Sequence, residues 1–318
     1  YANHLLRGAY KAMEEVARSI LLNQRSFEAD PMCAPVRNIF ETVGFLDVKE
    51  KDQQDESSTN IPVIIPAAGE DSLLKSVLHG KPKAMLEVAG KTLLAWQVST
   101  FNSNNLADIT VVTGYAHEKI RADGVTLWHN KNYKKGSELH SLIEARERMK
   151  NGFIMLYADI LLEEHIVTKL LTCREDIVLV VDNTIQYHSP EANKVQDLVI
   201  SKHKHKPTRR KISFVCENVI SKIGAKLNLE TATHEFIGLA KFTKTGRDQF
   251  LQTYEDCVKN YQGKFQEAAD IARLTFTDLI QEMIDRGYAI HFLEIHKGWL
   301  EIHRCEDIDL ANQFLSHH

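Results

Sequence analysis

The sequence predicts an α/β protein in which a mostly parallel sheet carries helices on both faces. Short, almost wholly apolar runs alternate with segments of helical periodicity, a rhythm typical of such sheets. The chain of 318 residues has room for one large domain of this class or two smaller ones. The runs expected to form strands are residues 63–66, 109–113, 125–128, 153–157 and 177–181. Because such sheets bind ligands at the carboxyl ends of their strands, residues that directly follow a strand are the first candidates for a functional site.

The expected helices lie between and after these strands. Residues 137–150 place Leu139 and Leu142 on one face and offer Ser137 as an N-cap. The other expected helices are residues 92–101, 247–261, 276–286 and 306–315, and a last strand is expected at residues 289–295.

Between residues 183 and 245 the rhythm changes to short strand-like pieces. The pieces at residues 198–201, 212–215 and 236–242 predict a small antiparallel addition or lid. The strongly basic run at residues 202–211 can attract phosphate, although a solvated hairpin loop is the commoner role of such runs.

The first sixty residues differ from the rest of the chain. Residues 1–45 have apolar residues at helical spacing, and residues 46–60 are almost wholly polar. This composition predicts an N-terminal helical tail, a linker and a domain boundary near residue 60, with the main domain at residues 61–318.

Charge and composition argue against several classes of function. The formal net charge of −4 disfavours a general nucleic-acid binder, and no apolar run is long enough to span a bilayer. The cysteines are odd in number, far apart and without Cys-x-x-Cys spacing, which favours a reducing compartment such as the cytoplasm and disfavours a structural zinc site. They are Cys33, Cys173, Cys216, Cys257 and Cys305.

The most informative motif begins at the first predicted strand. Ala67-Ala68-Gly69 ends this strand with small residues, which allow a nucleotide to lie against backbone N–H groups. Lys81-Pro82-Lys83 follows, and Lys83 offers a cation for the phosphates. Taken alone, the triplet is more often an ordinary strand-to-helix turn, and a lysine near a turn is usually a surface residue. Together they indicate chemistry on a nucleoside triphosphate, which needs a backbone cradle, cations and carboxylates that hold Mg²⁺.

Three further residues are candidate metal ligands. Asp159 directly follows a predicted buried strand, where a carboxylate can bind Mg²⁺, or can cap the helix expected to begin near residue 162. Glu301 and His303 alternate onto the same side of an extended segment, so both could face a metal. Exposed edge residues are the alternative interpretation of this last pair.

Residues 61–316 resemble the sugar-phosphate-type nucleotidyltransferases, close to the choline-phosphate and phosphonate cytidylyltransferases. The matching segments, in chain order, are residues 67–69, 81–83, 90–94, 111–115, 157–159 and 299–302. The resemblance implies the Rossmann-like sheet of these enzymes. It also implies CTP and a small phosphonate or phosphate ester as partners, Mg²⁺ as cofactor, and transfer of CMP with release of pyrophosphate.

The resemblance implies a role for each matching residue, with Lys83 stabilising the α-phosphate in the transition state. The residues expected to contact the nucleotide are Ala67, Ala68, Gly69 and Lys81. Those expected to hold Mg²⁺ are Asp159, Glu301 and His303. Those on the substrate side are Ser137, Glu138 and Ser141.

The phosphate loop departs from the family's pattern. The family usually has Gly-x-Gly-[Ser/Thr]-Arg, whereas in this chain Asp71 stands for the second glycine and Leu73 for the arginine. The loop also contains Glu70, and two acids repel a triphosphate unless a metal intervenes. Lys75 or Lys81 can replace the arginine only as a point charge.

The metal site departs from the pattern as well, because His303 stands where the family normally has an aspartate. An imidazole is a poorer Mg²⁺ ligand than a carboxylate. Because of these two departures, an alternative stays open: a catalytically degenerate domain that binds a nucleotide or has a regulatory role without catalysis. A related enzyme acting on phosphocholine or a sugar phosphate is a further alternative.

The N-terminal residues carry a second resemblance. Residues 1–13 look like the end of phosphoenolpyruvate mutase just after its barrel, and residues 34–40 resemble that enzyme's terminal helical segment. The resemblance implies an upstream mutase barrel and a role in phosphonate biosynthesis, where the second domain activates a phosphonate such as 2-aminoethylphosphonate. A homo-oligomer is also possible, because these helices can pack on a neighbouring chain.

Overall fold

The computed structural model describes residues 61–187, 196–202 and 218–316, which belong to one unit of the chain, Ser57–His318. Several sequence predictions fall outside these residues. They are the helical tail, the linker and its boundary near residue 60, the strand at residues 212–215 and nearly all of the basic run at residues 202–211.

A nine-stranded sheet forms the centre of the described residues, in the order β10-β9-β11-β6-β1-β4-β5, with β8 paired to β11 and β12 to β8. β10 and β11 run opposite to the other strands, so the predicted mostly parallel sheet is confirmed. The strands are β1 (Val63–Ala67), β4 (Ile109–Thr113), β5 (Val125–His129), β6 (Gly152–Leu156), β8 (Ile177–Asp182), β9 (Leu198–Ser201), β10 (Ile220–Gly224), β11 (His234–Thr243) and β12 (His291–Ile295).

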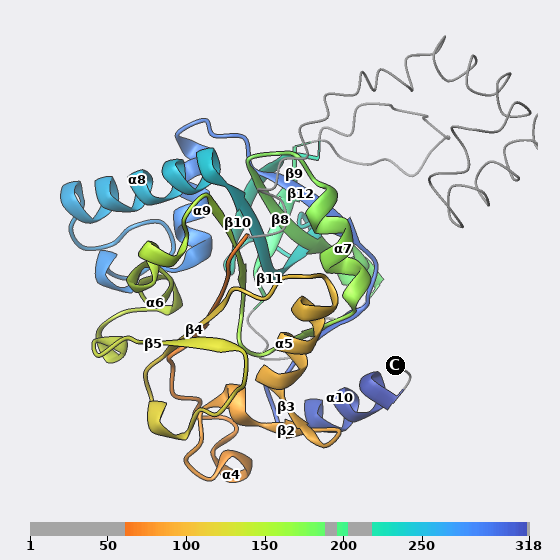
Figure 1. The fold of residues 1–318 in the computed structure, drawn as a ribbon. Helices are drawn as coiled ribbons and strands as arrows, with labels where there is room; N and C mark the ends of the chain where they lie inside the picture. Colours follow the sequence, from red (N-terminus) through yellow and green to blue (C-terminus); the bar gives the residue numbers. More distant parts are fainter. Residues whose placement is uncertain (1–60, 188–195, 203–217, 317–318) are drawn as a thin grey trace, which may run out of the picture. The chain divides into compact units, whose positions relative to one another are not determined.

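Helices cover both faces of this sheet, as predicted (Figure 1). One face packs against α6 (Glu138–Glu144), α8 (Lys244–Asn260) and α9 (Phe276–Asp285). The other packs against α5 (Leu93–Ser103) and α7 (Glu164–Thr172). The alternation of side chains along a strand divides the core accordingly, because Ile64 belongs to the first cluster and its neighbours Val63 and Ile65 to the second. Strands buried on both sides are mostly apolar, which is why they are recognisable as nearly continuous runs.

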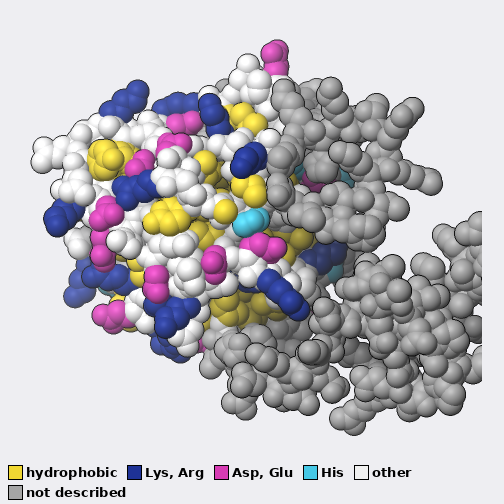
Figure 2. Space-filling view, turned by 90° about the horizontal axis from the view of Figure 1, so that it is seen from above, with side chains coloured by type: hydrophobic (Ala, Val, Ile, Leu, Met, Phe, Trp, Pro, Cys, Tyr) yellow, Lys and Arg dark blue, Asp and Glu magenta, His cyan; other side chains and the backbone are white. Residues whose placement is uncertain are grey.

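The surface is mixed in charge. Acidic and basic side chains are interspersed over the face shown in Figure 2, with hydrophobic side chains visible between them. In the described part of the chain, no helix has the length and apolar character needed to cross a bilayer.

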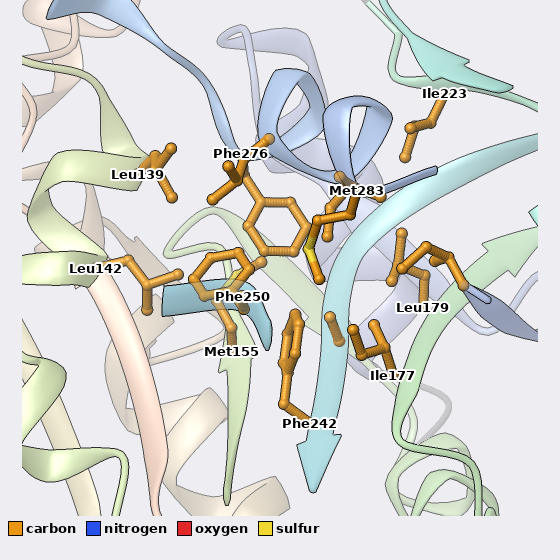
Figure 3. Close-up of a cluster of buried hydrophobic side chains, with 14 of the residues drawn as sticks. Leu139, Leu142, Met155, Ile177, Leu179, Ile223, Phe242, Phe250, Phe276 and Met283 are labelled. Carbon is orange, nitrogen blue, oxygen red and sulfur yellow. The ribbon is translucent and has the colours of Figure 1, made fainter. Parts of the chain in front are cut away.

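A group of aromatic rings fills the core beneath α8 and α9 (Figure 3). The ring of Phe250 lies with its centroid 5.0 Å from that of Phe242 and 5.8 Å from that of Phe276. All three side chains are completely buried. Phe276 is the first residue of α9, so this packing fixes the amino end of that helix.

A third apolar cluster joins α10 to the segment that follows β1. Leu74, which precedes α4 (Lys75–Leu78), packs in one cluster with Ile302 and with Ala311 of α10 (Glu306–Ser316). Two short pairings complete the structure, β2 (Glu87–Val88) with β3 (Lys91–Thr92) and β7 (Ile160–Leu162) with β13 (Trp299–Glu301).

One predicted helix is shorter than expected. Residues 137–150 were predicted as one helix, but α6 ends at Glu144 and a 3-10 turn follows at Arg146–Arg148. The N–H of Ala145 donates to the carbonyl of Leu142, which tightens the chain at this point. The tighter turn buries Met149 completely, directly before β6 begins.

Strand β11 changes register between Phe236 and Ala240. Gly238 lies between them with a φ of +79°, and a Cβ there would lie 2.5 Å from the ring of Tyr157. Only glycine combines this backbone conformation with such close contact. The bulge therefore leaves room for the Tyr157 ring beside the carboxyl end of β6.

Candidate active site

A cleft of about 590 Å³ opens at the carboxyl ends of β1 and β6. The starts of α6 and α9 and the end of β13 also line it. The predicted site residues that line this cleft are Ala67, Gly69, Lys83, Glu138, Asp159, Glu301 and His303. The fold thus brings a cation and two acids from distant parts of the chain together, at the edge of the sheet where ligands bind.

Lys83 lies between two carboxylates. It begins a 3-10 turn, Lys83–Met85, whose other residues are buried in the core. Its Nζ is 3.0 Å from Oδ2 of Asp71 and 3.0 Å from Oδ2 of Asp159. Burial alone would lower the pKa of Lys83, but the two carboxylates outweigh burial and raise that pKa. Lys83 is therefore a fixed ammonium group in the cleft.

Backbone pairing places Asp159 beside Glu301. The N–H of Ile302 donates to the carbonyl of Asp159 at 3.0 Å, and Glu301 pairs with Ile160 in the small sheet of β7 and β13. His303 lines the same cleft, and its backbone N–H donates to Asp307 near the start of α10.

The small residues after β1 divide into two groups. Ala67 and Gly69 line the cleft, and a Cβ at Gly69 would meet no described atom within 4 Å, so its backbone is open to a ligand. Ala68 is buried, and its carbonyl accepts a hydrogen bond from the N–H of Tyr115. Ala68 therefore supports the loop through this hydrogen bond and is not among the residues that line the cleft.

The two acids of the loop have different surroundings. Glu70 is 3.5 Å from Lys75, and both side chains are well exposed. Asp71 accepts hydrogen bonds from the N–H groups of Leu73 and Leu74 and pairs with Lys83. Burial would raise the pKa of Asp71, but these N–H groups and Lys83 outweigh it and lower that pKa. The carboxylate of Asp71 is thus part of the loop's own structure.

Besides Ala68, three predicted site residues are not among the described residues that line the cleft. Lys81 lies 3.5 Å from Glu87 at the surface. Ser137 is the N-cap of α6, as predicted, and its Oγ donates to the carbonyl of Leu274. Ser141 is buried, and its Oγ accepts from Asn130. The two serines fix the helix that presents Glu138.

Acidic groups gather where α6 and α9 begin. Oε1 of Glu138 accepts from the N–H of Phe276 at 2.9 Å, and burial raises the pKa of Glu138. Burial and then the charges of Glu138 and Glu301 raise the pKa of Asp197 to about 7. Ionising these carboxylates is costly because of burial and the neighbouring acids. A cation that enters this part of the cleft would therefore stabilise their ionised forms.

Sequence reasoning missed several lining residues, notably Asp197, Lys226, Thr275 and Thr277. Thr275 and Asp278 form a capping box at the start of α9, and the Thr-x-x-Asp spacing is a signal that could have marked this helix end. Asp197 and Lys226 belong to no motif that would have identified them.

The carboxylates of the cleft are ligands of the type that Mg²⁺ prefers. In the described residues, no group of three or more His, Cys, Asp or Glu side chains is arranged to hold a metal ion. Mg²⁺, however, is commonly bound by one or two carboxylates together with substrate phosphates and waters. Asp159 and Glu301 supply two hard oxygen donors in one cleft, which fits that requirement.

Residues 63–207, slightly less than half of the chain, match the family model described as the MobA-like NTP transferase domain. With the fold and the cleft, this match supports an enzyme of the nucleotidyltransferase type.

Individual relatives agree with this class. A CTP:phosphoglutamine cytidylyltransferase from Campylobacter jejuni is 24% identical over 263 residues, which cover 78% of this chain and 97% of the relative. Two solved structures share the fold. The CTP:phosphocholine cytidylyltransferase of Streptococcus pneumoniae is 15% identical, with a TM-score of 0.58 over 80% of this chain and 99% of its own. The inositol-1-phosphate CTP transferase of T. maritima is 17% identical, with a TM-score of 0.60 over 80% and 96%.

Proposed function

We propose that this chain transfers CMP from CTP to a small phosphonate or phosphate ester and releases pyrophosphate. The observation that carries the proposal is the meeting of Lys83, Asp159 and Glu301 in one cleft at the carboxyl ends of β1 and β6. The relatives that act on CTP support cytidine as the base.

Each residue has a task in such a transfer. The backbone at Ala67 and Gly69 lies open to the nucleotide, and the ammonium of Lys83 stabilises the charge that develops on the α-phosphate. Asp159 and Glu301 would hold Mg²⁺, which neutralises phosphate charge when bound. Lys83 must exchange its contact with Asp159 for one with the phosphate.

The acidic end of the cleft favours an acceptor with an ammonium group. Glu138 and Asp197 are partly buried acids with raised pKa values, and an ammonium beside them would allow both to ionise. An acceptor such as 2-aminoethylphosphonate has its phosphonate and its ammonium at opposite ends. It would direct the first toward Lys83 and the second toward these acids.

The wider setting is also a proposal. The resemblance of residues 1–13 and 34–40 to phosphoenolpyruvate mutase supports a place in phosphonate biosynthesis, with an upstream mutase barrel as a partner domain. In that arrangement the first domain makes the carbon–phosphorus bond and the second activates the product.

The direct test is pyrophosphate release. The chain is incubated with CTP, Mg²⁺ and, in turn, 2-aminoethylphosphonate, phosphocholine, phosphoglutamine and a sugar phosphate. We expect the highest rate with 2-aminoethylphosphonate and almost none in the Lys83→Ala variant. Equal, background-level release from both proteins with every acceptor would defeat the proposal.

A second function has an observation in its favour. Lys83 is already neutralised by two carboxylates, and Leu73, which replaces the family's arginine, is 56% exposed. These features favour a domain that binds a nucleotide without catalysis. Calorimetry that shows CTP binding in the absence of any turnover would support this alternative.

A further inference from the structure

Asp71 stands where the nucleotidyltransferases that this chain resembles have the second glycine of the phosphate loop, and the structure gives its carboxylate two sets of partners. Oδ1 accepts from the N–H groups of Leu73 and Leu74, both at 2.8 Å. Oδ2 lies 3.0 Å from Nζ of Lys83. One carboxylate therefore closes the turn of the loop with one oxygen and holds the lysine with the other.

This carboxylate is itself firmly anchored. Leu74 is completely buried in the cluster that includes Ile302 and Ala311, so the turn that Asp71 closes cannot move without disturbing that core. The side chains of Asp71 and Lys83 are each only 14% exposed. An ion pair with so little solvent and a fixed partner is worth more than the exposed pairs of the surface.

The neighbouring acid does not share this arrangement. Glu70 pairs with Lys75 at 3.5 Å, and their side chains are 42% and 66% exposed. A pair of that kind holds neither partner in one position. Because Glu70 pairs with Lys75, the placement of Lys83 depends on its own two partners, Asp71 and Asp159.

Asp159 cannot hold the lysine throughout the reaction. Under the proposed function it turns to Mg²⁺ when the nucleotide binds, which leaves Asp71 as the anchor of Lys83. We propose that Asp71 is a positioning residue that keeps the ammonium of Lys83 at the phosphate-binding end of the cleft. This inference rests on the proposed function, and it explains why an acid is tolerated in a loop that binds phosphates.

The first test needs no substrate. The rate at which an amine-directed reagent labels Lys83 is measured by peptide mass spectrometry at one pH, with the exposed Lys75 as internal reference. The variant is Asp71→Asn, whose amide oxygen can still accept from Leu73 and Leu74. The matched control is Asp256→Asn on α8, which removes the carboxylate that pairs with Arg286 at the end of α9. We expect Lys83 to be labelled at least about threefold faster in Asp71→Asn, because one of its two tethers is gone, and at the wild-type rate in the control.

The second test separates positioning from binding. With CTP, Mg²⁺ and an acceptor, we expect Asp71→Asn to lower kcat about tenfold without raising KM for CTP, because the misplaced ammonium affects the transition state more than the bound substrate. A raised KM with an unchanged kcat would overturn the proposal, as would wild-type labelling of Lys83 in Asp71→Asn. If no acceptor is turned over, the proposed function fails, and the labelling result still decides whether Asp71 holds Lys83.

Discussion

At the scale of single residues, Lys83 has a tightly defined position, because its ammonium meets two carboxylates at 3.0 Å in a mostly buried setting. Electrostatic groups held ready in this way contribute most when charge develops in the transition state. We predict that Lys83→Ala lowers kcat for CMP transfer about 10²- to 10³-fold, by analogy with the loss of one oxyanion donor. Steady-state pyrophosphate release measures this change.

A control for this variant is Lys150→Ala, which removes an exposed ammonium 2.9 Å from Asp108, outside the cleft. We expect its kcat to stay within about twofold of the wild type, since exposed pairs contribute little. Equal losses of kcat in the two variants would contradict a specific role for Lys83, because Lys150 is not among the residues that line the cleft.

Asp197 makes stability depend on pH. Its pKa is about 7 in the folded protein, against an ordinary value of 3.8. Between these values the folded chain keeps a proton that the unfolded chain has lost, so the free energy of unfolding falls as pH rises from about 4 to 7, by at most about 1.4 kcal/mol per pH unit. We predict that Asp197→Asn makes this decline shallower. Urea unfolding at pH 5, 6, 7 and 8 measures it, and parallel curves for the two proteins would contradict the assignment.

At the scale of elements, the bulge of β11 depends on a glycine. At Gly238 a Cβ would meet the ring of Tyr157 at 2.5 Å, and φ is +79°. We predict that Gly238→Ala lowers the free energy of unfolding by about 2–4 kcal/mol, from backbone strain and overpacking combined.

The chain offers a matched control for this variant. Gly263 has a similar φ of +74°, but a Cβ there would meet no described atom within 4 Å. Gly263→Ala should therefore cost only the strain, about 1 kcal/mol. Urea denaturation of both variants isolates the contact with Tyr157, and equal losses would remove that contact from the explanation.

The sequence predicted those elements whose burial leaves a continuous pattern. β4 was predicted with its observed bounds, because a strand covered on both faces is rich in apolar and β-branched residues. The pairing of β7 with β13 was not predicted, since three-residue strands far apart in the chain have no periodicity of their own. That pairing is what places Glu301 beside Asp159.

The residues of the site, like the elements of the fold, could be predicted only in part. Lys83 and Asp159 could be singled out from the sequence. Asp159 directly follows a predicted strand, and Lys83 lies shortly after the small residues that end the first one. Asp197 could not be singled out, because its significance arises only from folding, which partly buries it near Glu138 and Glu301. The partnership of Asp71 with Lys83 was equally hidden, since a sequence does not show which acid a lysine will reach.

At the scale of the whole molecule, the cleft gathers more acids than cations at the phosphate end. Asp71, Asp159 and Glu301 stand against Lys83. We predict that CTP binds at least about tenfold more weakly after divalent ions are removed with EDTA, because phosphate charge then faces uncompensated carboxylates. Isothermal titration calorimetry with and without Mg²⁺ measures the difference. Equal affinity in both conditions would mean that the protein alone compensates the triphosphate.

The cluster that joins Leu74 to Ile302 and Ala311 has a consequence for biosynthesis. A ribosome makes the loop after β1 well before it makes α10. The packing of Leu74 with Ala311 therefore exists only once the residues between them have emerged. A polypeptide stalled or cut short before α10 would have every chemical group of the loop but would lack that packing.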